Sequence, residues 1–270
     1  MRLASWILCL GVASCAGPRG GVTPGEDVDG AASTVIGCGP VDRARASDES
    51  ARRPAAPRSV LMVGNSFTFW NGGLWKPLEA GLRTVQPDAS VRACMRGGAS
   101  LEVQWGREKV QRWIQSGEHE VVVLQGDIPE ASVASFEEHA ALLIELCRAH
   151  GAEPVLFETW DYARLDWCSM EDIADAHRRV AARHGVRVIP VGEAWALARA
   201  QRPALDLYDQ DREHPNLRGS YLALVMIHAA LTHAEEGDLL PVPPAWSGLD
   251  AEEAAWLRAL AAEVLGLGEG

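Results

Sequence analysis

The sequence predicts an α/β protein, a three-layer α/β/α sandwich around a mainly five-stranded parallel sheet. From position 59 onward, short apolar runs alternate with longer segments of helical periodicity, which is the pattern of consecutive βαβ units. The apolar runs lack the polar-apolar alternation of a half-exposed strand, so we expect them to be buried on both faces. No internal repeat is visible, and we expect residues 59–270 to form one domain.

Five segments are expected to form the strands. The first is an apolar run that ends in glycine, and the third, with three consecutive valines, is the clearest. In order they are Ser59–Gly64, Val91–Met95, Glu120–Leu124, Pro154–Phe157 and Val186–Val191. Sites in such folds lie at the carboxyl ends of the strands, so the residues that follow these segments are the first candidates for chemistry.

The segments between and after the strands have helical periodicity. Ser100 is a suitable N-cap for the helix after the second strand. The helix near the C-terminus has an almost wholly apolar middle, which indicates a buried helix. The expected helices are Leu74–Val85, Ser100–Gln115, Phe136–His150, Glu171–His184, Leu217–Glu235 and Ala251–Val264.

The first residues indicate export. Met1-Arg2 provides a positive charge, and the apolar segment Leu3–Val12 leads into small residues, as in a signal peptide. Val12-Ala13-Ser14-Cys15 has the order of a bacterial lipoprotein signal, in which the cysteine is lipidated. The alternative is an ordinary signal peptide with a cysteine near its cleavage site. We expect residues 1–15 to be the export signal and Cys15 to be the lipidated residue.

Residues 16–58 are rich in glycine and proline and have no apolar periodicity, so we expect a flexible linker. Ala16 after the cysteine resembles an outer-membrane sorting signal. We therefore expect a lipid-anchored protein on the periplasmic or surface face of a bacterial outer membrane. No later stretch approaches the roughly 18 apolar residues of a spanning helix, so the N-terminal lipid is the only expected membrane contact.

Charge and motif content argue against several classes of partner. The net charge of -12 disfavours a nucleic-acid partner, because phosphate binding needs clustered Lys and Arg. No Gly-x-Gly-x-x-Gly follows the first strand, which disfavours a dinucleotide-binding module. The sequence contains no Cys-x-x-Cys pair, which disfavours a zinc site of that type. The cysteines beyond the export signal could form a disulfide or stay free, and their pairing is left open: Cys38, Cys94, Cys147 and Cys168.

Two distant motifs carry residue types suited to nucleophilic catalysis. The first strand ends in Gly64-Asn65-Ser66, which puts a hydroxyl at the carboxyl edge of the sheet, although the same residues also suit an ordinary turn. Asp211 stands three residues before His214 on an irregular segment, so its carboxylate can reach the imidazole and favour the protonated ring. Pro215 and Asn216 follow, and Asn216 can cap the next helix.

With these motifs at the two ends of an α/β pattern, the sequence resembles the SGNH/GDSL hydrolase superfamily over about residues 59–235. Members carry a serine block after the first strand and an Asp-x-x-His block near the C-terminus. Here Gly-Asn-Ser66 replaces the Gly-Asp-Ser of many members, and Gly219-Ser-Tyr-Leu after the His block is also typical. The resemblance implies a flavodoxin-like fold in which Ser66 is the nucleophile, His214 the base and Asp211 its partner.

The resemblance also implies an oxyanion hole, whose donors are the N–H groups of Ser66 and Gly98 and a third side-chain amide. Gly97-Gly98 also suits a tight strand-to-helix turn, which is compatible with the same role. The third family block, Gly-x-Asn-Asp, is here Leu124-Gln125-Gly126-Asp127. We expect Gln125 to supply the amide. A shift of register would instead bring Asp127 near the site, where a carboxylate would repel an oxyanion.

Together these features predict a serine esterase that cleaves small esters, with acetyl esters of carbohydrate as the first substrate hypothesis. Two-step acyl transfer needs no metal or organic cofactor. One alternative is an acyltransferase that passes the acyl group to a sugar hydroxyl on the same triad. The other is a non-catalytic carbohydrate-binding domain of the same fold. Trp70 and Trp75, just after the serine block, could line a pocket or serve in packing.

Overall fold

The computed structural model describes residues 55–267. The expected export signal, Cys15 and most of the expected linker lie outside this range. The described chain contains a five-stranded parallel sheet in the order β2-β1-β3-β4-β5. The strands are β1 Ser59–Gly64, β2 Ser90–Met95, β3 Val121–Gln125, β4 Glu153–Phe157 and β5 Arg187–Ile189. The predicted α/β class and the parallel sheet are therefore confirmed.

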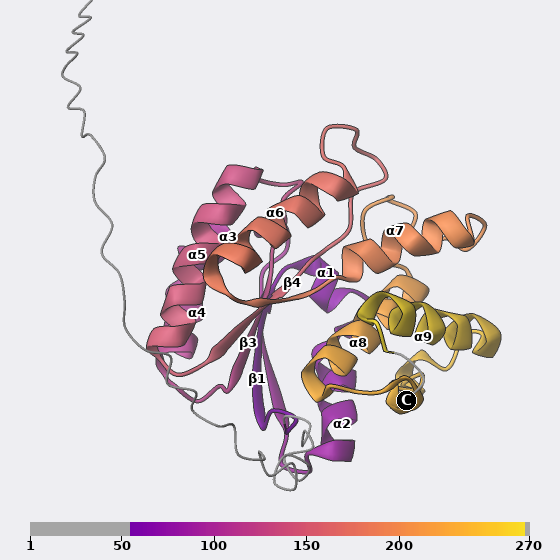
Figure 1. Ribbon diagram of the computed structural model, residues 1–270, viewed down its shortest axis with the longest axis horizontal. Helices are drawn as coiled ribbons and strands as arrows, with labels where there is room; N and C mark the ends of the chain where they lie inside the picture. The colour runs from indigo at the N-terminus through magenta and orange to yellow at the C-terminus, as the bar shows by residue number, and fades with distance from the viewer. Residues whose placement is uncertain (1–54, 268–270) are drawn as a thin grey trace, which may run out of the picture. The chain divides into compact units, whose positions relative to one another are not determined.

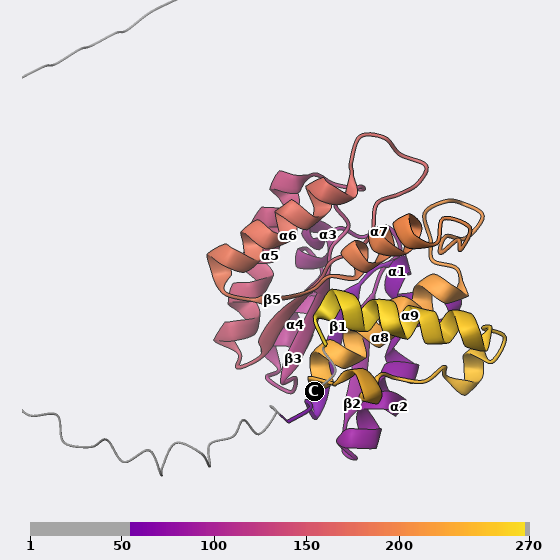
Figure 2. The same ribbon diagram turned by 45° about the vertical axis from the view of Figure 1, so that its right-hand side comes forward.

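Helices cover both faces of the sheet, as Figures 1 and 2 show. One face packs against α3, α4, α5 and α6, and the other against α2, α7 and α8, with α9 packed on α7 and α8. The helices are α1 Ser66–Phe69, α2 Trp75–Val85, α3 Leu101–Trp105, α4 Glu108–Gln115, α5 Val133–Ala149, α6 Met170–His184, α7 Val191–Gln201, α8 Leu217–Thr232 and α9 Ala251–Leu265.

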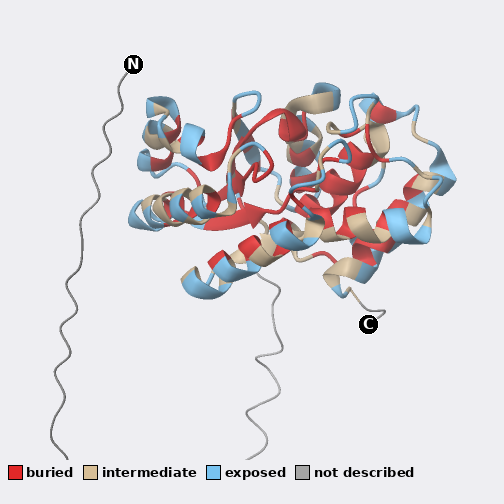
Figure 3. Ribbon diagram, turned by 90° about the horizontal axis from the view of Figure 1, so that it is seen from above, coloured by how far each residue is buried: buried red, intermediate tan, exposed pale blue. Residues whose placement is uncertain are grey.

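Each central strand sends alternate side chains into the two cores. In β1, Val60 and Met62 join the core beneath α2 and α8, whereas Leu61 and Val63 join the core beneath α3 to α6. This division follows from the two-residue period of a strand. Figure 3 shows the buried residues gathered on the sheet and on the inward sides of the helices, with exposed residues on their outer surfaces. Burial on both faces explains the continuous apolar runs in the sequence.

Several predicted boundaries differ from the structure, including the start of α5 at Val133 instead of Phe136, and three of the differences have a clear physical reason. The helix expected over 100–115 is two helices, because the chain breaks at Gly106 and Arg107 turns extended before α4. The fifth strand ends at Ile189 instead of Val191, since Pro190 has no N–H for the sheet and instead precedes the unpredicted helix α7. The helix expected to reach residue 235 ends at Thr232, because His233 adopts a left-handed conformation.

Two further properties bear on the expectations from the sequence. Within residues 55–267, no helix is both long and apolar enough to cross a membrane. Cys94, Cys147 and Cys168 are buried free thiols, and Cys38 lies outside the described residues. Strands β1 and β3 are parallel neighbours inside the sheet, so the turns that follow them lie side by side at its carboxyl edge.

Candidate active site

The Ser66 hydroxyl sits at the first turn beyond the central strand β1. Asn65 caps the short helix α1, and its side-chain oxygen accepts a hydrogen bond from Phe67 N at 3.0 Å. The carbonyl of Gly64 is held from below by the buried Gln104, whose amide donates to it at 2.5 Å. Ser66 itself is 8% exposed. The turn therefore holds a largely buried serine among hydrogen-bonded neighbours.

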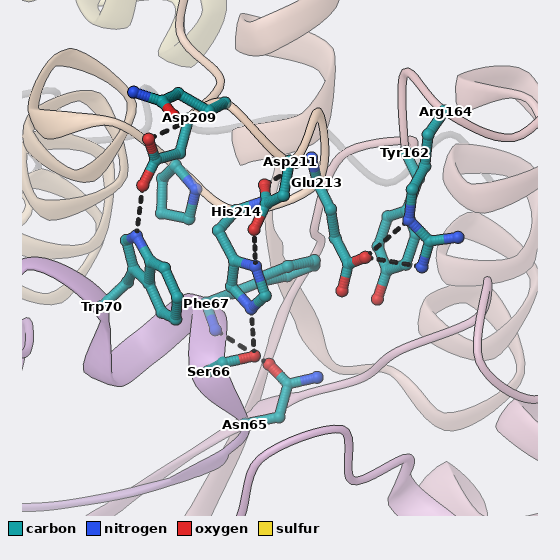
Figure 4. A network of polar contacts seen from close by, with 12 residues as sticks. Asn65, Ser66, Phe67, Trp70, Tyr162, Arg164, Asp209, Asp211, Glu213 and His214 are labelled. Atoms are coloured by element: carbon teal, nitrogen blue, oxygen red, sulfur yellow. Dashed lines mark hydrogen bonds and ion pairs between the residues drawn. The ribbon is translucent and has the colours of Figure 1, made fainter.

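The structure brings Ser66, His214 and Asp211 into one continuous chain of contacts (Figure 4). The Nε2 atom of His214 lies 2.7 Å from Ser66 Oγ, and its Nδ1 atom lies 2.7 Å from Asp211 Oδ2. Both distances are within ordinary hydrogen-bonding range. The residues that the sequence placed in two separate blocks, 148 positions apart in the case of Ser66 and His214, therefore meet at one point.

Asp211 is oriented by its own backbone turn. Its Oδ1 atom accepts hydrogen bonds from Glu213 N at 3.0 Å and from His214 N at 2.9 Å, which leaves Oδ2 for the imidazole. Partial burial acts to raise the pKa of Asp211, but the hydrogen bonds from His214 and Glu213 outweigh it and hold the pKa below its ordinary value. Asp211 is therefore ionised at neutral pH and favours a protonated His214.

The loop that carries this pair is closed at its base. Asp209 N donates to His214 O at 2.7 Å, and Tyr208 and Pro215 form an isolated antiparallel bridge. Asn216 caps α8 as predicted, accepting from Arg218 N and Gly219 N. Its amide nitrogen also donates to two carbonyls of the same loop. The loop is thus fixed to the start of a buried helix.

The other side of the loop is held by the segment after β4. The indole of Trp160 donates to Glu213 O at 3.0 Å. Arg164 donates from Nε to the Glu213 carboxylate at 2.7 Å, and Figure 4 shows Arg164 and Tyr162 beside this residue. The sequence did not single out this segment, because no local pattern in it marks a contact with a loop some 50 residues away.

Trp70, left open between pocket lining and packing, lies directly on the imidazole of His214. The two ring centroids are 3.9 Å apart and the planes differ by 17°. Phe67 meets the same imidazole edge-on, with centroids 5.6 Å apart. Two aromatic residues that follow the nucleophile in sequence thus surround the histidine that contacts it.

The expected oxyanion donors differ in their surroundings. Gly98 has φ of 61°, a left-handed turn conformation that favours glycine, and a Cβ there would meet nothing within 4 Å. Gln125 instead hydrogen-bonds to backbone groups around the turn: its amide oxygen accepts from Asn65 N at 2.7 Å, and its amide nitrogen donates to Gly126 O at 2.7 Å. This geometry does not support the expected donor role of Gln125, because its amide oxygen binds the backbone N–H of Asn65, the residue before the nucleophile.

Asp127 contacts the residue before the nucleophile. Its carboxylate accepts hydrogen bonds from the Asn65 side-chain amide and, at 2.8 Å, from the hydroxyl of Tyr162. Burial raises the pKa of Asp127 to about 7, against the opposing effect of the Tyr162 hydrogen bond. A shift of register would have brought this carboxylate beside the oxyanion. In the structure this carboxylate is satisfied by two donors and secures the cap of α1.

Among residues 55–267, no cluster of three or more His, Cys, Asp or Glu side chains is arranged to hold a metal ion.

The sequence matches no protein-family model, and no curated protein matches it. The structure is similar to several solved ones. A candidate SGNH hydrolase from Slackia heliotrinireducens is 27% identical, covers 65% of this chain and 98% of its own, and has a TM-score of 0.55. A DUF4886 family protein from Bacteroides uniformis is 18% identical, with 78% and 96% coverage and a TM-score of 0.57.

An acetyl xylan esterase, AlAXEase, is 16% identical, covers 64% of this chain and 98% of its own, and has a TM-score of 0.55. Other similar structures include a psychrotrophic esterase from Pseudoalteromonas and a protein described as a candidate lipolytic member of the G-D-S-L family from Desulfitobacterium hafniense. The resemblance predicted from the serine and histidine blocks is therefore confirmed, and the described chain has the fold of the SGNH/GDSL hydrolases.

Proposed function

We propose that this protein is a serine esterase in which Ser66 is the nucleophile, His214 the general base and Asp211 its charged partner. The observation that carries the proposal is the contact chain from Asp211 Oδ2 to His214 Nδ1 and from His214 Nε2 to Ser66 Oγ, each step 2.7 Å. A base within hydrogen-bonding range of a hydroxyl, and itself oriented by a third group, is the arrangement that activates a serine.

In the first half-reaction, His214 Nε2 takes the proton from Ser66 as its Oγ attacks the ester carbonyl. The carbonyl oxygen gains negative charge, and the tetrahedral intermediate collapses when His214 returns the proton to the leaving alkoxide. The alcohol departs and the acyl group remains on Ser66. Asp211, ionised at neutral pH, stabilises the positive charge that His214 carries between these two proton transfers.

In the second half-reaction, water replaces the alcohol. His214 takes a proton from water as the oxygen attacks the acyl carbon, and then returns a proton to Ser66 Oγ as the acid leaves. We assign oxyanion binding to the backbone N–H groups of Ser66 and Gly98. A missing third donor reduces transition-state stabilisation by about 2.7–4 kcal/mol, so with Gln125 engaged elsewhere we expect a modest rate.

We propose small esters as substrates and acetyl esters of carbohydrate as the first class to test. Ser66 keeps 8% of its surface exposed, and Trp70, which stacks on His214, is half-buried. Aromatic faces of this kind suit sugar rings. An acetyl xylan esterase is among the similar structures, which supports this choice of substrate class.

The enzyme proposal is tested by hydrolysis of p-nitrophenyl acetate and of acetylated xylan. We expect activity in the wild type, its loss in Ser66→Ala, and its retention in Ser116→Ala, because Ser116 is exposed at the end of α4 and contacts only its own helix turn and the next residues. Hydrolysis that survives in Ser66→Ala would refute the assignment of the nucleophile.

The two alternatives appear as distinct outcomes of the same test. Acetyl release that requires an added acceptor sugar would indicate an acyltransferase on the same three residues. Sugar binding that persists in Ser66→Ala, with no turnover in the wild type, would indicate a carbohydrate-binding domain. The hydrogen-bonded state of Ser66 Oγ favours the enzyme, since a binding domain has no need of a base on that hydroxyl.

We also propose that the protein is exported and anchored through a lipid on Cys15. The support is the order Val12-Ala13-Ser14-Cys15 after a charged start and an apolar segment. Metabolic labelling with a fatty acid should mark the wild type and not Cys15→Ala. Membrane fractionation should place the labelled protein in the outer membrane, and its recovery in the inner membrane would contradict the proposed location.

A further inference from the structure

The residues directly after the nucleophile helix bind the loop that carries the base. Trp70 follows α1, four positions after Ser66, and its indole stacks on the imidazole of His214 with ring centroids 3.9 Å apart. The indole N–H donates to Asp209 Oδ2 at 3.1 Å. Asp209 in turn donates its backbone N–H to His214 O at 2.7 Å. Figure 4 shows the indole beside the imidazole, with its nitrogen directed at the Asp209 carboxylate.

The next residue makes a second connection to the same loop. The side-chain amide of Asn71 donates to Pro215 O at 2.9 Å and to Ser220 Oγ at 2.8 Å. Asn71 has φ of 51°, a left-handed conformation, and its carbonyl accepts from the indole of Trp246 at 3.1 Å. A turn that is unfavourable for most residues is thus held by contacts on three sides, which fixes the indole of Trp70 in place.

Stacking has an electrostatic consequence. The face of an indole carries partial negative charge, so it attracts a cation placed over it by about 0.5–2 kcal/mol. His214 becomes a cation only after it takes a proton from the attacking group. The attraction is therefore stronger in the transition state than in the resting state, which is the condition for lowering a barrier. The Asp209 carboxylate on the indole N–H adds negative charge to the same ring.

We propose that Trp70 is a positioning residue that keeps the imidazole of His214 in line with Ser66 and stabilises its protonated form, with Asp209 acting through the indole N–H. This inference rests on the proposed function, in which His214 is the base. It differs from packing alone, because packing would hold the ring equally well with any side chain of similar size and would not distinguish charged from neutral imidazole.

Other charged groups near His214 must be considered in a titration. Asp209, Asp211 and Glu213 lie on its own loop, and Glu213 is paired with Arg164 from the segment after β4. Arg212, also on the loop, is paired with Asp206. The segment from Ser66 to Gly73 that packs against the ring carries no charged side chain. Substitution of Trp70 therefore changes the ring over His214 without removing a charge from its surroundings.

The test follows the His214 side chain by NMR in the full chain labelled with ¹⁵N-histidine, with the resonance assigned through His214→Asn. We expect Trp70→Leu to move the titration midpoint to lower pH by about half a unit to one and a half units, and Trp70→Phe to move it less. Trp113→Leu is the matched control, because Trp113 lies on α4 beside Lys109 and contacts none of these residues.

Equal midpoints in the wild type and in Trp70→Leu would overturn the proposal, as would an equal shift in Trp113→Leu. If Trp70→Leu does not fold, Trp70→Phe and Asp209→Asn provide the test. Each should lower the titration midpoint of His214, and an unchanged midpoint in both variants would refute the proposal. The titration of His214 can be measured without turnover, so the proposal for Trp70 can be refuted whether or not the protein is an esterase. In an active enzyme, Trp70→Leu should also lower kcat on the order of ten-fold with little change in KM.

Discussion

The imidazole Nε2 of His214 lies 2.7 Å from the hydroxyl oxygen of Ser66, across 148 positions of sequence. The two residues lie on segments that are held in place by different elements. Ser66 begins the helix that follows strand β1, and His214 lies on a loop that ends at the cap of α8. The distance between Nε2 and Oγ therefore depends on the contacts that fix each segment.

The Asp211–His214 contact should control the rate of hydrolysis. In Asp211→Asn the side chain can still occupy the same space, but it loses the charge that stabilises protonated His214. We expect kcat to fall by about 10²–10⁴-fold with a smaller change in KM, measured with p-nitrophenyl acetate. Asp88→Asn, at an exposed turn before β2, is the control. Activity within two-fold of the wild type in Asp211→Asn would exclude this role.

Gln125 should matter for stability through its contact with Asn65. Replacing it with leucine keeps the volume but leaves the buried Asn65 N–H without its acceptor. Such a loss lowers the free energy of unfolding by about 1–3 kcal/mol. Urea denaturation of Gln125→Leu measures the change, with Gln115→Leu on the exposed end of α4 as control. An equal stability of the two variants would show that the Gln125 amide contributes nothing to the turn.

The stability of the protein should depend on pH through Asp127. Its folded-state pKa of about 7 lies above the ordinary value of 3.8, because burial disfavours the charged form. The folded state therefore holds the proton more tightly, and stability present below pH 4 is lost as the pH rises toward 7. The slope is at most about 1.4 kcal/mol per pH unit for one such group.

Asp127→Asn removes this titration while keeping a hydrogen-bonding side chain, so its free energy of unfolding should vary less between pH 5 and pH 8 than that of the wild type. Glu158, whose pKa burial raises to about 8, contributes a slope of the same sign in both proteins. Denaturation at several pH values gives the comparison. A parallel pH dependence in the wild type and in Asp127→Asn would contradict the prediction.

Gly219 should be required for close packing at the start of α8. A Cβ atom at this position would lie 2.2 Å from the Trp195 ring and 2.6 Å from Leu207 O. We expect Gly219→Ala to destabilise the fold by about 1–3 kcal/mol and to lower activity, because α8 anchors the His214 loop. Gly248→Ala, where a Cβ meets nothing within 4 Å, should leave the thermal midpoint and the activity unchanged. Equal midpoints for both variants would refute the steric argument.

The central fold could be predicted because strands buried on both faces leave a strong local pattern. Glu120–Leu124 and Ser59–Gly64 are apolar runs for the same reason that β1 and β3 occupy the middle of the sheet. The helix α7 was missed although its alanine-rich sequence favours a helix, because it follows β5 through Pro190 with no linker to mark a boundary. Its Trp195 stacks on Trp160 within the core.

Some residues of the candidate site could likewise be predicted from the sequence, and others could not. Ser66, Asp211 and His214 could be named from the sequence, because their short spacings carry a chemical pattern. Trp70 could not be assigned, since its contact with His214 depends on the path of a loop 139 or more positions away. The donor role of Gln125 stays a prediction that the contacts of its amide do not support, because a local block predicts an amide near the site but not which way that amide points.

The most direct test of the account is labelling by a fluorophosphonate, which reacts with an activated serine, followed by identification of the modified peptide. The account predicts one adduct, on Ser66, that is abolished in Ser66→Ala and strongly slowed in His214→Asn, with labelling unchanged in Ser116→Ala. An unlabelled wild-type protein, or an adduct on another serine that persists in Ser66→Ala, would contradict it.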